Sequence, residues 1–449
     1  MSKHAKEQNE SVPLGTRGTI TAWALWDAGG ASFNAVMTTF VFTVYLTSKA
    51  FGDPKDASEM LSTGLAIAGL LIALLAPVTG QRADASGQRT LWLAVNTFLT
   101  AVLMALCFFT FPEPQWLLYG VTLICAANVM NEFAIVNYNA LLPELSTPST
   151  VGKISGIGWS AGYFGGIIAL GIVLFAFVGL GSDTGFLGIS PDNSLNIRAV
   201  AIFSAVWSII LSTPLVIALY RHDRRHPKKP VAPKVGLIDS YKKLWATLKS
   251  LYKNSPKTLA FLFASAIFRD GFTGIFTFGG IVAAGTFGFS TTEIIIFAIA
   301  GNVVAGIGAL LGGKFDDLIG PKRVIVSSLV CLLISATPLL FIQSPIVFWI
   351  CGLGLCAFVG PAQSASRTYL SRITPPGHEG EIFGLYSTTG RAAAPLAPLL
   401  FGLFVWAFGA QIWGILGIMV VLVAGLLLTL PLPRVHRKEH QETLEKGQL

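Results

Sequence analysis

The chain has 449 residues, of which 53% are hydrophobic and 12% are charged. Ordinary soluble domains carry about 25% charged residues, so this composition excludes a single soluble core and predicts a protein whose apolar surface faces lipid. The net charge of +8 at pH 7 gives no reason to expect a nucleic-acid partner, because membrane topology accounts for the placement of the basic residues.

Twelve apolar stretches of about 20 residues or more recur along the chain, each long enough to cross a bilayer as an α-helix. The sequence therefore predicts an all-α polytopic membrane protein with twelve transmembrane helices. The predicted spans are 18–47, 58–79, 90–111, 115–142, 153–179, 197–220, 258–287, 291–312, 322–342, 345–370, 381–408 and 410–432.

Basic residues are distributed unequally over the two faces of this predicted membrane protein. Of the 31 lysines and arginines, three lie in loops on one face, three lie inside apolar runs, and the other 25 lie on the opposite face. Because cytoplasmic loops are enriched in lysine and arginine, we expect both termini on the cytoplasmic side of the cytoplasmic membrane. The six exceptions are Lys49, Lys55 and Arg198 in loops, and Arg269, Arg367 and Arg391 in apolar runs.

Composition changes sharply at residues 221–230, which are basic and interrupted by proline, and which separate the first six spans from the last six. After them, large apolar side chains recur at helical spacing from Leu237 to Tyr252, with lysines on other positions. This pattern predicts an amphipathic helix on the cytoplasmic lipid surface, with a calmodulin-type target helix as the alternative. The predicted organisation is a tail (1–17), a six-helix bundle (18–220), a linker (221–257), a second bundle (258–432) and a tail (433–449).

A short polar motif occurs in both halves, between the second and third span of each. It places Gly, Asp, Gly and a cation at relative positions 0, 4, 7 and 9, and the two copies lie 233 residues apart. Each copy is expected to form a glycine-punctuated turn, and the repetition indicates two pseudo-symmetric halves of six helices. The copies are Gly80, Asp84, Gly87 and Arg89, and Gly313, Asp317, Gly320 and Lys322.

Charged side chains at membrane depth cost about 2.5–3.5 kcal/mol each, so those in the apolar runs are candidate functional residues. Polar residues also follow one face of several spans. In the first, Asp27 and Asn34 share a face with Trp23, Gly30 and Thr38. The other candidates are Asn128, Asn131, Glu132 and Asn139 in the fourth span, Arg269, Asp270, Thr273 and Thr277 in the seventh, Gln363 and Arg367 in the tenth, and Arg391 in the eleventh.

Acids in one half and arginines in the other suit a zwitterion, whose ammonium Asp27 or Glu132 could hold while Arg269 or Arg391 binds its carboxylate. The alternative is that these charges only pair with one another and lock helices or a gate. Proton coupling needs a carboxylate that alternates between desolvated and hydrated states, which makes Glu132 the first candidate and Asp27 the second. Sodium coupling would use carboxylate and amide oxygens of the same region. Cysteines and histidines show no metal-ligand spacing, so neither metal nor cofactor is expected.

Two parallel six-helix repeats are typical of major facilitator transporters, and the motif from Gly80 to Arg89 resembles the loop motif of that superfamily. More narrowly, four segments resemble the branch of fungal vacuolar amino-acid effluxers and their bacterial relatives. They are AWALWD at 22–27, YNALLPEL at 138–145, SGIGWSAGY at 155–163 and RDG at 269–271. The chain departs from that branch at Ala28-Gly29-Gly30, where relatives usually carry an aromatic residue or alanine followed by asparagine, so a first-helix substrate contact could differ here.

This resemblance implies a secondary active transporter that works by alternating access, with amino acids as the expected substrate class and a proton or sodium ion as coupling partner. It also implies that the repeated motif is a gate, with Asp84 at the start of the eleventh span and Arg82 and Arg89 on neighbouring acids or lipid phosphate. Asp317 and Lys322 are the corresponding residues of the second half. We expect a monomer without enzymatic activity. Sugar or drug transport, and more remotely a receptor or a lipid scramblase, are the alternatives.

Overall fold

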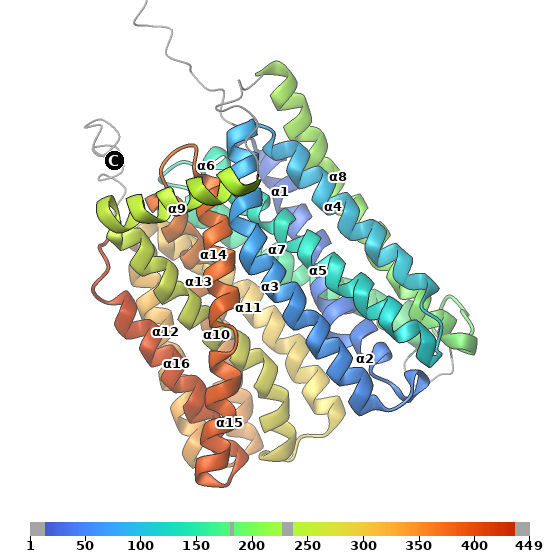
Figure 1. The fold of residues 1–449 in the computed structure, drawn as a ribbon. Helices are drawn as coiled ribbons and strands as arrows, with labels where there is room; N and C mark the ends of the chain where they lie inside the picture. The colour runs from blue at the N-terminus through green and yellow to red at the C-terminus, as the bar shows by residue number, and fades with distance from the viewer. Residues whose placement is uncertain (1–13, 180–183, 227–236, 436–449) are drawn as a thin grey trace, which may run out of the picture.

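The computed structural model describes residues 14–179, 184–226 and 237–435, so most of both predicted tails and the middle of the linker lie outside the described residues. Within the described part of the chain, twelve helices are long and apolar enough to cross a membrane. This confirms the predicted all-α fold of twelve spans, whose two halves stand side by side in Figure 1.

The first half is built from spans whose ends are often marked by short 3-10 or π segments. Its spans are Arg17–Leu46, Pro54–Ser86, Arg89–Phe109, Pro114–Ala140, Val151–Val178 and Asp192–Arg225. Its elements are α1 (Arg17–Ser32), η2 (Phe33–Phe40), α2 (Phe42–Leu46), η3 (Lys49–Phe51), α3 (Pro54–Ser86), α4 (Arg89–Leu106), η4 (Cys107–Phe109), η5 (Pro114–Trp116), α5 (Leu117–Ala140), α6 (Leu142–Leu145), α7 (Val151–Ile172), η6 (Val173–Val178), η7 (Asp192–Ser194) and α8 (Leu195–Arg225).

The second half repeats this arrangement after the amphipathic helix α9 (Leu237–Asn254). Its spans are Pro256–Gly285, Glu293–Ile319, Pro321–Phe341, Pro345–Ile373, Glu379–Phe408 and Gln411–Thr429. Its elements are α10 (Pro256–Gly285), α11 (Thr291–Ile319), α12 (Pro321–Phe341), α13 (Pro345–Ile373), α14 (Glu379–Ala393), α15 (Leu396–Phe408), η8 (Gln411–Trp413) and α16 (Gly414–Thr429).

The repeated motif forms the last turns of α3 and α11, where a longer polar turn was expected. Only a tight connection remains between each of these helices and the next. Gly87 ends α3 in the left-handed region at φ 64°, with its N–H bonded to the carbonyl of Asp84, and Gly320 ends α11 at φ 89°. Glycine takes such φ values without the steric cost of a Cβ, so helix can continue through the polar residues up to these positions. We call the end of the bundle that carries Asp84 and Asp317 the motif end.

Proline interrupts the helical hydrogen-bond pattern at several places in the described helices, and at two of them another helix bonds to nearby backbone groups. Pro77 lies inside α3 and has no N–H, so it cannot bond to the carbonyl of Ala73. The Thr388 hydroxyl of α14 donates to that carbonyl at 2.8 Å instead. In the eleventh span, Pro395 separates α14 from α15. Both interruptions place backbone groups where another helix can bond to them.

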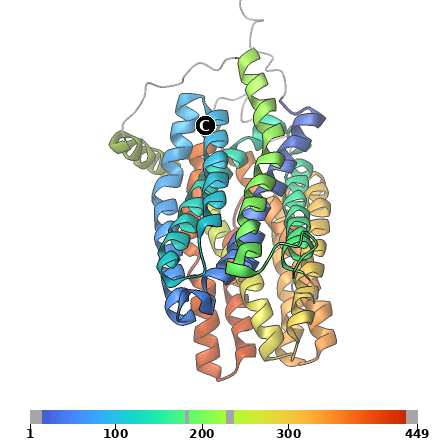
Figure 2. The same ribbon diagram turned by 90° about the vertical axis from the view of Figure 1, so that its right-hand side faces the viewer.

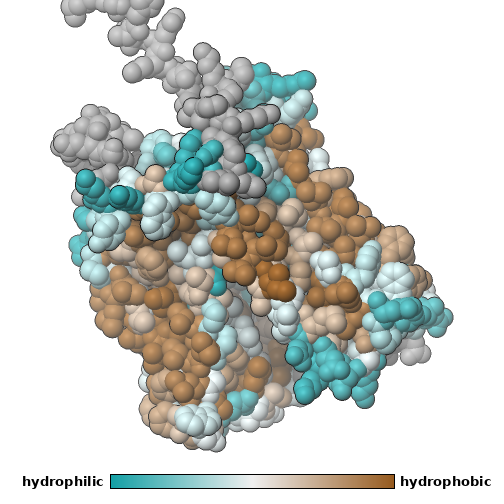
Figure 3. Space-filling view, viewed as in Figure 1, coloured by the Kyte–Doolittle hydropathy of each residue, from teal (hydrophilic) through white to brown (hydrophobic). Residues whose placement is uncertain are grey.

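Glycines let the two halves approach closely at the motif end. A Cβ added at Gly156 of α7 would lie 2.5 Å from the carbonyl oxygen of Ala309 in α11, and one at Gly384 of α14 would lie 2.5 Å from Cα of Pro77. Both neighbours are backbone atoms, so no side-chain rotation could make room. Toward the opposite end the halves diverge, and the space-filling view is hollowed between them (Figures 1 and 3). The structure is therefore a state closed at the motif end and open at the other.

Candidate functional site

An ion pair between the halves lies where the polar stripes of α5 and α14 meet. The guanidinium of Arg391 donates to Glu132 at 2.9 Å, and the hydroxyl of Ser387 donates to the other oxygen of the same carboxylate at 2.7 Å. The Glu132 side chain is 14% exposed and that of Arg391 is 35% exposed. The pair thus joins the halves while one member keeps access to solvent.

Arg269 of α10 lies close enough to Glu132 for its positive charge to attract that carboxylate. Its guanidinium stands 3.7 Å from the ring centroid of Tyr386 and donates to the carbonyl of that residue at 3.1 Å. The Tyr386 hydroxyl in turn lies 2.8 Å from the Ser366 hydroxyl. Arginine has five N–H donors, and the Tyr386 carbonyl accepts from only one nitrogen of Arg269. Other N–H groups of Arg269 can therefore bond to a different acceptor. Arg269, Arg391 and Glu132 therefore form one mixed-charge cluster, which we call the ion-pair cluster.

Asp27 belongs to a separate, aromatic group in the first half. Tyr138 is stacked between Trp23 and Trp26, with ring centroids 4.5 and 4.3 Å away, and its hydroxyl donates to Asp27 at 3.2 Å. The first helix reaches this position because small residues face α7 and α8, and a Cβ at Gly29 would lie 3.1 Å from Leu211. The Asp27 side chain is 27% exposed. Its carboxylate is thus oriented by a neutral hydroxyl and remains reachable by solvent.

Arg367 of α13 is the one charged side chain of the second half that enters this aromatic group among the described residues. It donates to the hydroxyl and carbonyl of Ser155 at 3.0 and 2.6 Å and to Asn139 at 3.2 Å, and it lies 3.9 Å from Asp27. Its guanidinium also stands 4.8 Å from the Trp23 ring. Arg367 is buried, and all these contacts cross between the halves, so every one of them must break before the motif end can open.

The predicted amide residues lie in different surroundings. Gln363 accepts a 2.6 Å bond from the Tyr163 hydroxyl, which joins the tenth span to the fifth. Asn131 is buried and Asn128 is half-buried on α5, beside Glu132 in sequence. Asn34 is exposed within the π segment η2, where its carbonyl accepts the Thr38 and Thr39 hydroxyls. Their expected contact with substrate remains a prediction for all four.

Asp270 makes its contact within its own half. The sequence places it with the polar residues of the seventh span, and the structure buries its side chain against the eleventh span, where its carboxylate accepts the Ala397 N–H at 2.6 Å. That N–H belongs to the first turn of α15, which Pro395 has separated from α14 and which therefore lacks helical acceptors. Asp270 caps this broken helix within its own half. Its expected contact with substrate remains a prediction.

At the motif end, the first copy of the motif joins α3 to the start of α14. Asp84 accepts the Glu381 N–H at 3.0 Å, as expected for an anion at a helix N-terminus. Arg89 holds Asp84 at 2.6 Å, Glu144 at 2.7 Å and Glu379 at 3.1 Å. His378 bonds to Glu381 at 3.1 Å, which raises the pKa of the imidazole. We call this cluster the first latch.

The second copy repeats the arrangement with the halves exchanged. Asp317 of α11 accepts the N–H groups of Gly152 and Lys153, both at 2.8 Å, in the first turn of α7. Arg372 of α13 supplies the cation, 3.0 Å from Asp316 and 3.4 Å from Asp317. The two halves are therefore joined twice by the same geometry, an aspartate at one helix end facing the N-terminus of a helix in the other half.

Lys322 does not take the place of Arg89 in the second latch. Its ammonium bonds to the carbonyls of Leu430 and Leu432 at the end of α16, within its own half. The side chain that does take that place, Arg372, is the basic residue near the end of α13, and sequence spacing from the motif does not point to it. Arg82 lies half-buried in the last turns of α3.

Several contact residues are not among the candidates that the sequence indicates. Tyr138 and Ser155 lie inside the segments that carry the family resemblance, so a signal was present without an assigned partner. Ser387 and Glu379 belong to a span that reads as apolar with a polar start. Their contacts depend on which helices face each other across the halves, which no local pattern specifies.

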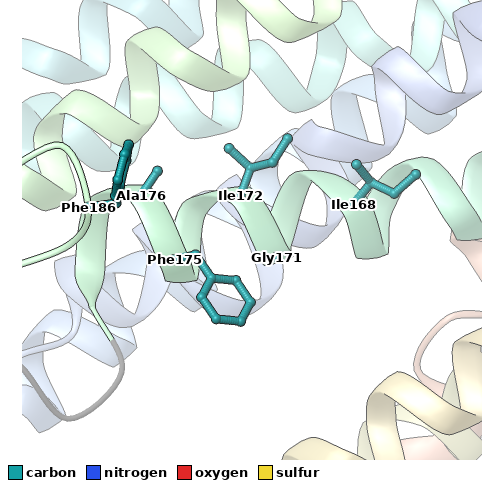
Figure 4. A pocket seen from close by; sticks show the side chains of 6 residues that line it. All are labelled: Ile168, Gly171, Ile172, Phe175, Ala176 and Phe186. Atoms are coloured by element: carbon teal, nitrogen blue, oxygen red, sulfur yellow. The ribbon is translucent and has the colours of Figure 1, made fainter.

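A separate hollow on the surface of α7 and η6 is apolar. Ile168, Ile172, Phe175 and Phe186 line it together with Gly171 and Ala176 (Figure 4). It contains no charged side chain and none of the residues of the ion-pair cluster or the aromatic group. A polar solute would gain no hydrogen bond from these side chains.

Comparison with known proteins agrees with this architecture. A family model described as "Vacuole effluxer Atg22 like" matches residues 49–442. The Bacillus subtilis (strain 168) protein "Uncharacterized MFS-type transporter YxiO" is 25% identical over 421 residues, which cover 91% of this chain and 93% of that protein. "Autophagy-related protein 22" of Yarrowia lipolytica (strain CLIB 122 / E 150) is 25% identical over 327 residues, covering 66% of this chain and 53% of the relative. The chain thus spans about half the length of the fungal relatives it matches.

Solved structures of the major facilitator superfamily share the fold. The proton:xylose symporter XylE superposes with a TM-score of 0.72 at 14% identity, covering 95% of this chain and 98% of that one. FucP in the outward conformation gives 0.69 at 13% identity, covering 94% and 99%. These identities support the fold alone, whereas the family model covers most of the chain. The chain therefore belongs to the Atg22-like vacuole effluxer family and is a major facilitator superfamily transporter, not an enzyme.

Proposed function

We propose that this transporter moves amino acids by alternating access and is driven by a proton gradient. The observation that carries the substrate class is the ion pair of Glu132 with Arg391, which takes one member from each half and leaves the arginine partly exposed. An amino acid offers the same two charges. Its carboxylate can take the place of Glu132 on Arg391 and also accept hydrogen bonds from Arg269. Its ammonium can take the place of Arg391 on Glu132. Binding then replaces one buried charge contact by two, without leaving a charge unpaired.

The coupling carboxylate on this proposal is Asp27. Glu132 already has a guanidinium and a hydroxyl as partners, so a proton would compete with an ion pair there. Asp27 has a neutral tyrosine donor and a guanidinium at 3.9 Å, and it is partly exposed. Protonation of Asp27 would remove its attraction to Arg367, the residue that holds α13 to the first half, and would favour opening at the motif end.

We further propose that the motif end faces the cytoplasm of a cytoplasmic membrane. Among the described residues, most lysines and arginines outside the apolar spans lie in segments near that end, and the positive-inside rule then predicts the orientation. On this assignment, the structure is an outward-open state in which substrate enters from outside and the two latches close the cytoplasmic side.

Counterflow in proteoliposomes tests the substrate class. Vesicles loaded with one unlabelled amino acid at a time take up the labelled compound, in competition with the matching amine that lacks the carboxylate. The wild-type protein should prefer the amino acid, because only it can bind Arg391. A charge-assisted hydrogen bond contributes about 1.5–3 kcal/mol, so Arg391→Ala should reduce this preference about tenfold to a hundredfold. Lys55→Gln, an exposed charge at the opposite end, is the matched control.

Two results would overturn the proposal on substrate class. One is counterflow of no amino acid by a protein that is active with another solute, such as a sugar. The other is an Arg391→Ala variant that keeps the wild-type preference for amino acid over amine. Coupling has its own test: Asp27→Asn should retain counterflow, which needs no net proton movement, and lose pH-driven accumulation. Accumulation driven by a sodium gradient in place of a pH gradient would contradict the proton assignment.

A further inference from the structure

The surface of α9 has three stripes in order around the helix. Leu244 and Leu251 are buried, seven residues or two turns apart, and they pack into the core cluster shared with α10. One position further along, Trp245 and Tyr252 are also two turns apart, but they are 71% and 74% exposed. The protein itself thus covers the leucine stripe and leaves the aromatic stripe uncovered.

The third stripe is basic. Lys242, Lys249 and Lys253 are exposed on the side of the aromatic stripe that faces away from the buried leucines. The whole of α9 contains four lysines and one acid, Asp239. That acid lies 3.4 Å from Lys242 in an ion pair between two exposed side chains, which contributes little and leaves the lysine free to bind another anion.

The position of α9 near one end of the bundle suits contact with lipid headgroups. The helix lies across the bundle at its outer edge, near the motif end (Figures 1 and 2). Tryptophan and tyrosine favour the boundary between acyl chains and headgroups, and lysines beyond them reach the phosphate layer. Because the lysines outnumber the acid, the headgroups that fit are anionic, such as those of phosphatidylglycerol.

Contacts of α9 reach both halves. It runs into α10 through the single residue Ser255, and the Tyr241 hydroxyl donates to the carbonyl of Leu74 in α3 at 3.1 Å. The neighbouring carbonyl of α3, Ala73, is the one freed by Pro77 and bonded by α14. The linker helix α9 and α14 of the second half therefore bond to adjacent carbonyls of α3, one turn before Pro77, in the state closed at the motif end.

We propose that α9 is a binding surface for anionic lipid headgroups, and that headgroup binding braces α3 against α10 and favours the state closed at the motif end. This inference rests on the membrane location and on the closed geometry, and it holds for any substrate. Its failure would leave the amino-acid proposal intact, because the counterflow test can be made in neutral lipid.

The test uses the full chain in nanodiscs. Its native cysteines are replaced by alanine, and an environment-sensitive fluorophore is attached at Ala246→Cys, an exposed position beside the lysine stripe. Increasing phosphatidylglycerol in phosphatidylcholine should shift the emission to the blue. A lysine near an anionic surface contributes about 1 kcal/mol, so Lys242→Gln with Lys249→Gln should weaken the apparent affinity for phosphatidylglycerol about thirtyfold. Lys49→Gln with Lys55→Gln, near the opposite end, is the matched control and should behave as the unsubstituted protein.

A second readout reports the bracing. Spin labels at Pro148→Cys and Arg323→Cys, exposed positions in the two halves at the motif end, should show a larger short-distance population when phosphatidylglycerol is present. Tyr241→Phe should reduce that gain while keeping the fluorescence shift. Headgroup binding would be overturned if the emission wavelength did not change with lipid charge. It would also be overturned if the emission changed with calcium-loaded calmodulin and not with phosphatidylglycerol. An unchanged distance distribution would overturn the bracing.

Discussion

Replacing Gly156 by alanine is predicted to open the motif end. The added Cβ would lie 2.5 Å from the Ala309 carbonyl oxygen and 3.0 Å from Cα of Gly313. Real Cβ atoms essentially never approach closer than 3.0 Å, so α7 and α11 must separate by at least about 0.5 Å along this contact. Overpacking of this kind costs about 1–3 kcal/mol, and the cost falls only on the state in which the helices touch. The closed state should therefore lose a factor of about 5 to 150 in its population relative to the open one.

The assay is the distance between spin labels at Pro148→Cys and Arg323→Cys in a cysteine-free background. Gly156→Ala should move the distribution toward longer distances. Gly171→Ala on the same helix is the matched control, because a Cβ there meets nothing within 4 Å. Both substitutions gain the same helix propensity, up to about 1 kcal/mol, so that term cancels between them. If Gly156→Ala and Gly171→Ala give the same distribution as the unsubstituted protein, close glycine packing does not control the closure.

Two further predictions concern the first latch and the broken eleventh span. The pKa of His378 is raised by its hydrogen bond to Glu381 and by the nearby carboxylate of Asp84, so its contribution to the closed state should be full below about pH 6.5 and lost as pH rises through the raised pKa. The distance between the two spin labels should lengthen over that rise, and His378→Gln should remove the pH dependence. A His378→Gln protein with an unchanged pH response would exclude this imidazole as its cause. Asp270→Ala leaves the Ala397 N–H without its acceptor, which should cost about 1–3 kcal/mol and lower the melting temperature in detergent, while Asp270→Asn keeps an acceptor oxygen and should melt near the unsubstituted protein.

The sequence pattern predicted some of the latch residues at the motif end and not others. The motif spacing and the family resemblance together anticipated that Asp84 would lie at the start of the eleventh span, because an aspartate at that position satisfies exposed N–H groups of a facing helix. They did not identify Arg372 as the cation of the second latch. That side chain is 50 residues away from Lys322 along the chain, and only the packing of α13 against α11 brings it to Asp317.

The charged residues inside the spans have different partners, and no periodicity of the sequence indicates which partner each one has. Asp270 and Arg269 are adjacent in sequence, yet one caps a broken helix in its own half and the other stacks on Tyr386 beside the ion-pair cluster. A helix turns about 100° per residue, so neighbours necessarily face different helices. Sequence alone showed that both charges lie at membrane depth, and it gave no means of assigning their partners.

The sequence by itself determined the class of this protein: twelve apolar spans, two related halves, an amphipathic linker helix and a family. These features are local or repeat along the chain, because lipid requires every span to satisfy its backbone bonds internally and to present an apolar surface. Tertiary structure alone decided that Glu132 meets Arg391, that Arg367 crosses to Asp27 and that the motif end is closed. Each of these depends on the relative position of two six-helix bodies, which a transporter must change during its cycle and which the chain therefore cannot encode as one fixed pattern.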